Sequence, residues 1–266
     1  MKFLRAAGLF TILLAPVGRL WAQEPQPSGQ AVIAATPEEQ STSLIRLLPR
    51  IATEQKRIWT FPVAAAHGKG WKPALIVLTA TVALVALDPV DSPYFQSNSF
   101  QQSPAVHRIN HVLSGPTTSL AIAVVPVSFY LGGLLAKDSY ASQTALLAGE
   151  AVANAAIVTL LVKDISRRML PGEVRPNGNL SDTWFDTNHR SAGGFGSFPS
   201  GHAAAAFAVA TVFAERYRHH RWVPFVAYGL AGVVAFSRLS NQAHFPSDIF
   251  MGAALGSSIS HFAVLR

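Results

Sequence analysis

The sequence predicts an all-α protein: a six-helix bundle, embedded in a membrane and preceded by an N-terminal signal segment. Half of its 266 residues are apolar and only 13% are charged, a balance typical of chains that sit in lipid or have an unusually apolar core. Six apolar segments rich in Ala, Val and Leu follow one another, without the alternating apolar and polar runs that indicate strands. We therefore expect helices over residues 73–88, 117–136, 143–162, 202–214, 222–236 and 249–264.

The residues before this bundle fall into three parts. Residues 1–22 have a basic start, an apolar body and a plausible cleavage site, so they read as a signal peptide or, if uncleaved, as an anchor. Residues 23–42 begin with a run rich in Pro and Gln and read as a disordered linker. Residues 43–71 carry Leu and Ile at near-helical spacing among Arg and Lys. They predict an amphipathic helical segment that lies on its own domain or on lipid. The domain itself would then occupy residues 72–266.

The net charge of the chain indicates which kinds of partner it can bind. The formal net charge is +7, with a pI near 10.1. Nucleic acid is the usual partner of such a chain, but no motif of interleaved aromatic and basic residues supports it. An anionic membrane surface or a phosphate substrate explains the charge better. The chain has no Cys, which excludes disulfides and thiolate chemistry.

The first polar motif is Pro199-Ser200-Gly201-His202, which precedes an alanine-rich run. Alanine is the best helix former, so a tight turn here leads directly into a helix. The first amides of a helix have no internal partners, and together with the helix dipole they favour an anion. His202 adds a group that can titrate near neutral pH. An ordinary Ser N-cap beside an incidental His is the alternative interpretation.

The second polar motif lies between the last two apolar segments. It contains Ser237-Arg238, then after five residues His244, and then after three residues Asp248. Arg238 can bind a phosphate through paired N–H donors. His244 can act as a nucleophile, and Asp248 can hold the imidazole by its other nitrogen. A loop with merely solvated charges is the alternative.

Together these motifs resemble those of the type 2 phosphatidic acid phosphatase (PAP2) superfamily, which includes lipid phosphate phosphatases, bacterial class A acid phosphatases and vanadium haloperoxidases. The residues 199–202 match the second motif of that family in full. Ser237, Arg238, His244 and Asp248 match its third motif, spacing included. The resemblance covers about Lys72 to the C-terminus and implies a PAP2-type helical domain.

The first motif of the family, a Lys followed after six residues by Arg-Pro, is incomplete. Lys163 and Pro171 are in register, but Leu170 stands where the Arg is expected. Arg168 or Arg175 could supply the missing guanidinium, and these two also have the motif's spacing with Arg in place of Lys. We favour Lys163 with Arg168, because Lys163 ends an apolar run. Loss of one phosphate-binding Arg predicts slower catalysis or an inactive protein.

The resemblance implies a metal-independent phosphatase that works through a phosphohistidine and needs no cofactor. His244 would attack phosphorus, Asp248 would orient His244, and His202 would protonate the leaving alcohol. The residues implied to hold the phosphate are Lys163, Arg168, Ser200, Gly201 and Arg238, with Arg175 as a further candidate. The expected substrate is a phosphomonoester or pyrophosphate, and the expected partners are a phosphorylated lipid or isoprenoid phosphate and the surrounding membrane lipids.

The motifs also predict a topology. They place the ends of the third and fifth apolar segments, and the starts of the fourth and sixth, at one face. A basic cluster at 216–221 and Lys137 then lie at the opposite face. In a membrane the positive-inside rule makes that face cytoplasmic, so the site would face the periplasm from the inner membrane of a bacterial-type cell envelope. Several segments are only about 14–16 residues long, short of a full span, and a cleaved signal would reverse the orientation. A soluble or peripheral periplasmic protein is therefore the alternative.

Two other functions remain open at this point. Leu170 would suit a non-catalytic envelope protein of the same fold that binds phosphate or lipid. A vanadium haloperoxidase would use nearly the same anion cradle, although the chain is short for that branch of the family. Phosphate release against bromide oxidation with added vanadate separates the enzymes.

Overall fold

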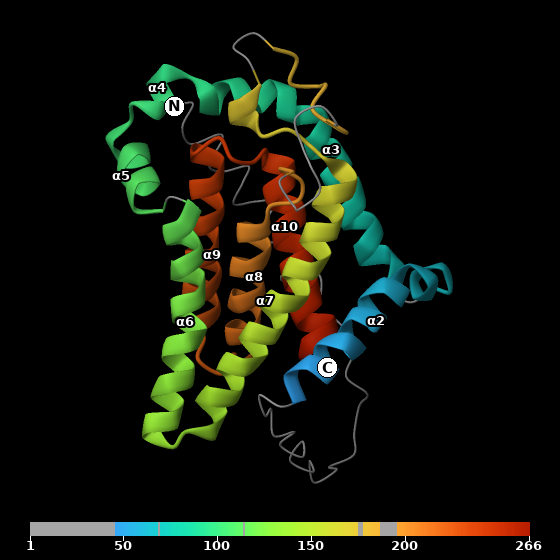
Figure 1. Cartoon of the computed structure of the whole chain (residues 1–266), viewed down its shortest axis with the longest axis vertical. Coiled ribbons are helices and arrows are strands. Elements are labelled where there is room, and N and C mark those ends of the chain that lie inside the picture. The colour runs from blue at the N-terminus through green and yellow to red at the C-terminus, as the bar shows by residue number, and fades with distance from the viewer. Residues whose placement is uncertain (1–45, 69, 114, 175–177, 187–195) are drawn as a thin grey trace.

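A computed structural model describes residues 46–266 apart from 69, 114, 175–177 and 187–195. The predicted signal segment, the predicted linker and Arg175 lie outside the described residues. Within those residues the regular elements are all helical, which confirms the all-α class. Figure 1 shows the long helices running side by side along the longest axis of the molecule.

The six predicted apolar segments correspond to six long helices, which alternate in direction along the bundle. They are α3 (Trp71–Gln96), α6 (Gly115–Ala136), α7 (Ser139–Ser166), α8 (Gly201–Arg216), α9 (Trp222–Ser240) and α10 (Pro246–Ile259), the last continued by a short π-helical turn, η3 (Ser260–Val264). The sequence did not predict the short helices between α3 and α6, which are α4 (Asn98–Gln101) and α5 (Pro104–Val112). Helix α2 (Leu47–Ala66) precedes α3, and a 3₁₀ turn, η2 (Pro171–Glu173), follows α7.

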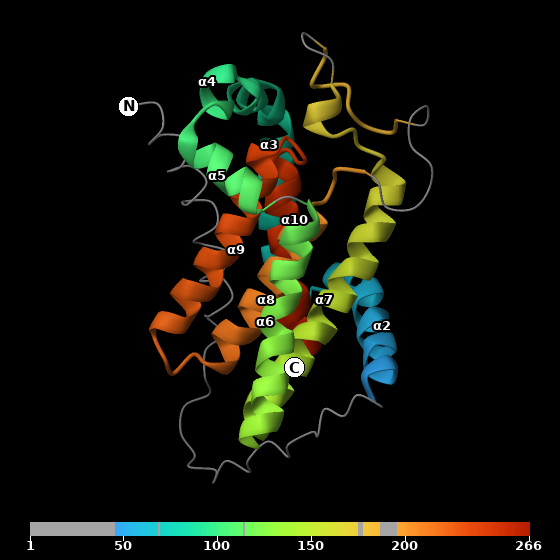
Figure 2. The same cartoon turned by 60° about the vertical axis from the view of Figure 1, so that its left-hand side comes forward.

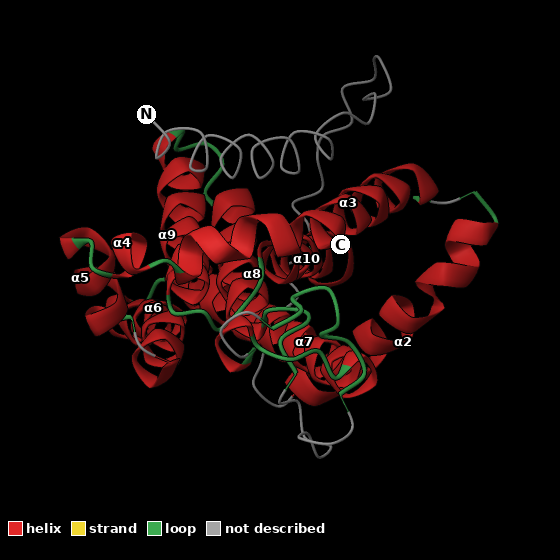
Figure 3. Ribbon diagram, turned by 90° about the horizontal axis from the view of Figure 1, so that it is seen from above, coloured by secondary structure: helices red, strands yellow, loops and turns green. Residues whose placement is uncertain are grey.

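Helix α8 is the centre of the bundle, in contact with α6, α7, α9 and α10 (Figure 3). Its first turns consist largely of alanine, and Ala203, Ala204 and Ala208 are almost completely buried. Small side chains allow neighbouring helices to approach closely, so an alanine-rich helix suits the position where four others converge. Helix α8 is only 16 residues long, and it ends at Arg216, next to the exposed Glu215.

Helices α8 and α10 approach each other so closely at Gly252 and Gly256 that no side chain fits at these two positions. A Cβ atom built on Gly252 would lie 2.4 Å from the Ser200 carbonyl oxygen, and one on Gly256 would lie 2.0 Å from that of Ala204. Only glycine fits at such distances. The contact brings the start of α10 against the start of α8, and the Ser200 N–H donates to the Asp248 carbonyl oxygen at 2.9 Å.

The helix ends follow from local sequence. The Asp138 side chain accepts the Ala141 N–H at 3.1 Å and caps the start of α7, and the Ser200 hydroxyl caps α8 in the same way. Pro246 is the first residue of α10, a position that needs no N–H partner. Arg167 adopts a left-handed conformation (φ 41°) and ends α7.

A polar contact attaches α2 to the middle of α7, and Figure 2 shows the two helices side by side. Glu150, the charge that interrupts the third apolar segment, is completely buried and accepts from Arg50 Nε at 2.9 Å. Asn154, one turn further along α7, donates to Glu54 and accepts from Gln55. A buried charge inside an apolar helix needs such partners.

Among the described residues, four helices are long and apolar enough to cross a membrane: α3, α6, α7 and α9. Their outward faces carry large exposed apolar side chains, such as Val82 on α3 and Leu131 on α6. Exposed apolar area of this extent indicates contact with lipid. The remaining two bundle helices, α8 and α10, are shorter and more deeply buried.

Candidate active site

The two complete motifs meet at one end of the bundle, where α7 and α9 end and α8 and α10 begin. Lys163 comes from the end of α7, His202 from the start of α8, and Arg238 from the end of α9. His244 lies in the turn between α9 and α10, two residues before α10 begins. The basic segment at 216–221 lies at the opposite end, between α8 and α9.

A cavity of about 900 Å³ opens at this end. Five of the predicted site residues line it: Lys163, Gly201, His202, Arg238 and His244. From there the cavity continues between α6 and α7, where most of the lining side chains are apolar. The charged side chains of its lining are therefore confined to one end.

His244 is held by the backbone. Its Nδ1 atom lies 2.7 Å from the Ser197 carbonyl oxygen, which can only accept, so Nδ1 carries the proton of the neutral ring. The lone pair then resides on Nε2. Burial lowers the pKa of His244, because the charged ring would lose its hydration, although nearby Asp248 partly offsets this. The neutral, nucleophilic form of His244 is thus favoured.

Asp248 lies behind His244, away from the cavity. Its Oδ2 atom accepts the Phe245 N–H at 2.8 Å and lies 3.7 Å from His244 Nδ1, beyond hydrogen-bond distance. Its Oδ1 atom accepts from Arg168 Nη1 at 2.6 Å. Burial alone would raise the pKa of Asp248, but His244 and Arg168 outweigh it and lower the pKa, so the carboxylate stays ionised.

His202 projects from the first turn of α8 toward the start of α6. Its Nε2 atom lies 3.0 Å from the Ser119 hydroxyl and 3.3 Å from the Gly115 carbonyl oxygen. Burial lowers the pKa of His202 to about 4, and the positive charge of Arg238 contributes to the shift. A bound anion would offset both effects, because it supplies negative charge beside the ring.

The two cations of the cavity are anchored by main-chain oxygens. Lys163 Nζ donates to the Gly196 carbonyl oxygen, and Arg238 Nη2 donates to that of Leu113. Arg238 Nε also donates to the neighbouring Ser237 hydroxyl at 3.2 Å. Together with the Gly201 backbone at the start of α8, these cations form a cradle suited to an anion.

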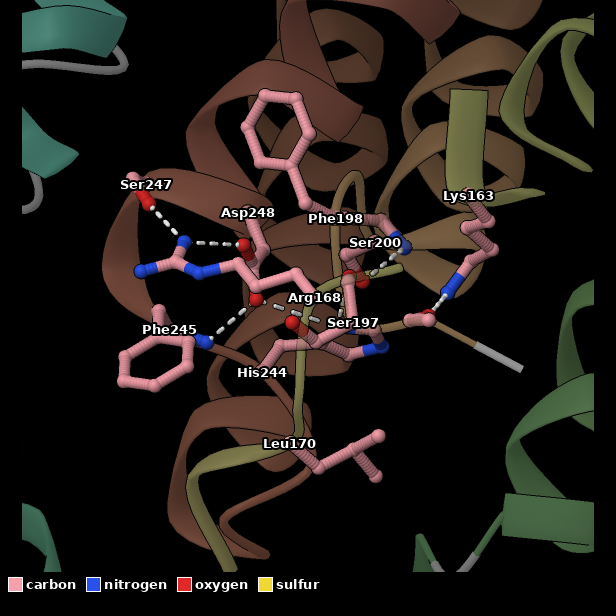
Figure 4. Close-up of polar contacts among 12 residues, drawn as sticks. Lys163, Arg168, Leu170, Ser197, Phe198, Ser200, His244, Phe245, Ser247 and Asp248 are labelled. Atoms are coloured by element: carbon pink, nitrogen blue, oxygen red, sulfur yellow. Dashed lines mark hydrogen bonds and ion pairs between the residues drawn. The ribbon is translucent and has the colours of Figure 1, made fainter. Parts of the chain in front are cut away.

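The structure does not bring Arg168 to the cavity, contrary to its predicted role as a phosphate ligand. Its side chain is completely buried, and its guanidinium is bonded to Asp248, Asp88 and Ser247. Figure 4 shows the guanidinium turned toward Ser247 and Asp248, with Lys163 on the other side of the view. Two carboxylates already bind this cation, which explains why it does not face the cradle.

Two further positions of the motifs are Ser200, which was expected to bind phosphate, and Leu170, which replaces the Arg of the first motif. Ser200 is buried and does not line the cavity, since its hydroxyl accepts the Ala203 N–H and caps α8. Leu170 does line the cavity, so an aliphatic side chain stands in the wall where the motif would place a guanidinium. Arg175, the other candidate for that role, lies outside the described residues.

Comparison with known proteins agrees with the motifs. The family model described as the PAP2 superfamily matches residues 144–265, which run from α7 to the end of the chain. The resemblance of the motifs to the PAP2 superfamily is thus confirmed over residues 144–265. The matched region contains all the predicted catalytic and phosphate-binding positions of this protein.

Two curated relatives share part of this PAP2 region. The lipid A 1-phosphatase of Porphyromonas gingivalis is 35% identical over 86 residues, which are 32% of this chain and 16% of that protein. The lipid A 4'-phosphatase of Bacteroides thetaiotaomicron is 35% identical over 92 residues, 34% of this chain and 40% of that protein. The matches thus span less than half of either relative. A transmembrane PAP2-type phosphatidylglycerolphosphate phosphatase from Bacillus subtilis covers 82% of this chain and 92% of its own, with 18% identity and a TM-score of 0.41.

Several residues at this PAP2 site were not predicted from the sequence. Asp88 from α3 and Ser247 bind Arg168, Ser197 binds His244 through its carbonyl oxygen, and Ser119 contacts His202. A backbone carbonyl leaves no signal in a sequence. Asp88 was visible as a charge at the end of an apolar segment, but nothing in the sequence showed which residue it would meet.

Proposed function

We propose that this protein is a lipid phosphatase that hydrolyses a phosphomonoester through a phosphohistidine formed on His244. The supporting observation is the shape of the cavity, which has cations at one end and an apolar channel beyond them. Along α7 the cavity lining extends from Lys163 to Ala145 and includes Leu146. At a helical rise of 1.5 Å per residue, Lys163 and Leu146 are about 25 Å apart. A substrate that fits combines a phosphate with a long apolar part.

The apolar wall of the cavity continues onto the outer surface of the bundle. Val127 and Leu131 on α6 and Leu160 on α7 line the cavity, and each is about half exposed, at 54%, 53% and 48%. A lipid can therefore enter between α6 and α7 without leaving an apolar environment. The relatives named as lipid A phosphatases make an acylated glycolipid phosphate the first substrate to test.

The residues divide the reaction into two steps. His244 Nε2 attacks phosphorus while Lys163, Arg238 and the Gly201 amide stabilise the charge on the phosphate oxygens. The bond from phosphorus to the lipid oxygen breaks, and His202 protonates that oxygen. Water, deprotonated by His202, then attacks the phosphohistidine and releases phosphate. The Ser197 carbonyl oxygen holds the Nδ1 proton of His244 throughout.

The test is phosphate release by the purified protein in EDTA, from hexa-acylated lipid A, phosphatidate, undecaprenyl pyrophosphate and a soluble aryl phosphate. We expect release from the lipid monoesters that vanishes in His244→Ala. Retained phosphate binding without release would instead identify a binding protein, for which Leu170 is the structural argument. Bromide oxidation with added vanadate would identify a haloperoxidase.

A variant within the channel tests whether the lipid chain binds there. Gly149 lines the cavity, and a Cβ atom added to it would meet nothing within 4 Å. Gly149→Leu should lower kcat/KM for a lipid phosphate and leave that for the aryl phosphate unchanged. Gly232→Leu on α9 is the matched control, since its added Cβ atom also meets nothing and it lies outside the cavity lining. Equal loss on both substrates would contradict this placement of the chain.

We further propose that the site faces the periplasm from the inner membrane. The support is the basic segment at 216–221 and Lys137, which lie at the end of the bundle opposite His202 and His244. Basic residues are typical of the cytoplasmic ends of membrane helices. Because the chain has no Cys, single cysteines can be labelled without background. In intact cells an impermeant maleimide should label Phe185→Cys near the site, whereas Arg218→Cys should require permeabilisation. The reverse pattern would place the site in the cytoplasm.

A further inference from the structure

We propose that Arg168 is a positioning residue, which fixes Asp248 and through it the His244 imidazole, with Asp88 as its second anchor. This inference rests on the proposed function, in which His244 is the nucleophile. It assigns to Arg168 a role behind the nucleophile in place of direct contact with the phosphate.

The Arg168 guanidinium binds two carboxylates from different parts of the fold. Its Nη1 atom donates to Asp248 Oδ1 at 2.6 Å and to Ser247 Oγ at 2.8 Å. Its Nη2 atom donates to Asp88 Oδ2 at 2.7 Å, and Nε donates to Thr183 Oγ1 at 3.2 Å. All three nitrogens are thus used, and the fork shape of the group joins α3 to the start of α10.

Two aromatic rings prevent the guanidinium from moving. Its central carbon lies 4.4 Å from the centre of the Trp184 ring and 3.9 Å from that of Phe245. Arg168 is only 1% exposed, so water does not compete for its donors. A planar cation held between rings is geometrically fixed in a way that a lysine ammonium would not be.

This fixed cation determines how Asp248 meets His244. With Oδ1 bound by Arg168 and Oδ2 bound by the Phe245 N–H, the carboxylate cannot rotate. Oδ2 is thereby held 3.7 Å from His244 Nδ1, on the side of the ring away from the cavity. Without Arg168 the carboxylate would lose one of its two fixed ends.

The charge of the cluster also matters for the reaction. Asp88 and Asp248 carry two negative charges, both completely buried, and Arg168 neutralises one of them. The remaining negative charge lies beside the ring that becomes an imidazolium when it bonds to phosphorus, and stabilises it. Two buried carboxylates without a cation would not both stay ionised.

Arg168→Lys tests the proposal, because it keeps the charge and loses the fork. We expect kcat for a lipid phosphate to fall about 10²-fold, as for a small misplacement of a catalytic group. KM and the inhibition constant of inorganic phosphate should stay near their wild-type values. If both constants instead weaken in proportion to kcat, Arg168 contacts the phosphate and the proposal is overturned.

A second readout needs no activity. In the ¹⁵N spectrum of labelled histidine, His244 of the wild type should show a protonated Nδ1 and an unprotonated Nε2. In Arg168→Lys we expect the same tautomer, because the Ser197 carbonyl oxygen still holds Nδ1, but shifted and broadened signals of both ring nitrogens, because Asp248 is no longer fixed beside the ring. An unchanged spectrum would overturn the positioning role. A wild type with the expected spectrum but no phosphate release would overturn the proposed function alone.

Further variants separate this role from a purely structural one. Removing one partner of a buried ion pair destabilises a protein strongly, so the charge-balanced pair Arg168→Gln with Asp88→Asn is made alongside. It should fold and still show the loss of kcat, whereas recovery of kcat would show that only stability was at stake. Arg167→Lys is the matched control, since the Arg167 Nε donates to the Asp164 carbonyl oxygen, outside the cluster. It should leave both readouts unchanged.

Discussion

The Nδ1 atom of His244 lies 2.7 Å from the Ser197 carbonyl oxygen and 3.7 Å from Oδ2 of Asp248. The backbone therefore selects the tautomer of the proposed nucleophile, and the carboxylate contributes charge and alignment. This differs from a serine protease triad, in which the aspartate itself holds the ring nitrogen.

Asp248→Asn should consequently be milder than the corresponding change in a triad. Loss of the tautomer costs about 10⁴-fold in kcat there, but the Ser197 carbonyl oxygen is untouched by the substitution here. We expect a loss nearer 10²-fold, the order expected for misalignment. Single-turnover phosphate release is the measurement, and a loss of the full triad size would show that Asp248 sets the tautomer.

Leu170→Arg should improve phosphate binding and turnover. Leu170 lines the cavity beside the cradle, and a guanidinium there could form charge-assisted hydrogen bonds worth about 1.5–3 kcal/mol, or roughly 10–100-fold in kcat/KM. Ile165→Arg adds the same charge to an exposed position of α7 outside the cavity lining and should have little effect. If both variants behave alike, general electrostatic attraction explains the result and the position of Leu170 does not.

Sulfate should inhibit more strongly as the pH falls from 8 toward 5. The pKa of His202 is lowered to about 4 by burial and then by Arg238, in the absence of an anion. Sulfate remains a dianion across this range and offsets the positive charge of Arg238, so the pKa of His202 rises on binding. A group whose pKa rises on binding takes up a proton, and the affinity then increases at lower pH. The measurement is the competitive inhibition constant as a function of pH.

Two variants test whether His202 is the group that causes this pH dependence of sulfate binding. His202→Asn should remove it, because the titrating ring is gone. His244→Ala should retain it when sulfate binding is measured directly by calorimetry. A pH dependence that persists in His202→Asn would mean that another group takes up the proton.

Gly256→Ala should destabilise the protein and lower its activity. The added Cβ atom would lie 2.0 Å from the Ala204 carbonyl oxygen and 2.9 Å from the carbonyl carbon, so the two helices must separate. Overpacking of this kind costs about 1–3 kcal/mol. In Gly232→Ala on α9 the new Cβ atom meets nothing within 4 Å, and the loss of a helical glycine should instead stabilise by about 0.5–1 kcal/mol. Thermal unfolding in detergent compares the two, and equal melting temperatures would contradict the close approach.

The helices were predictable because their signal is local. Apolar runs mark the six long helices, and the alanines after His202 mark the buried one. The short helices α4 and α5 were not predicted, since they lie in a stretch of mixed composition with no clear periodicity. The cluster of His202, Arg238 and His244 at one end of the bundle followed from the motifs, which place the ends of consecutive helices together.

The role of Arg168 was not predictable for a physical reason. It stands near the register of an incomplete motif, which made it a natural candidate to bind phosphate. Its actual partners, Asp88 and Asp248, are each 80 residues away along the chain. Only the packing of α3 against α10 brings them together around one guanidinium. Contacts of this range depend on the whole fold and have no local signature.

The contact of Gly252 and Gly256 with the backbone of α8 has a consequence for how the protein can move. The anion-binding turn at the start of α8 and the Asp248 end of α10 are joined with no side chain between them that could slide or rotate. These two parts therefore behave as one rigid block. The helix opposite them, α6, supplies Ser119 to the ring of His202 and one wall of the channel. We therefore expect adaptation to substrates of different size to occur at the channel wall that α6 provides, while the block formed by α8 and α10 keeps its shape.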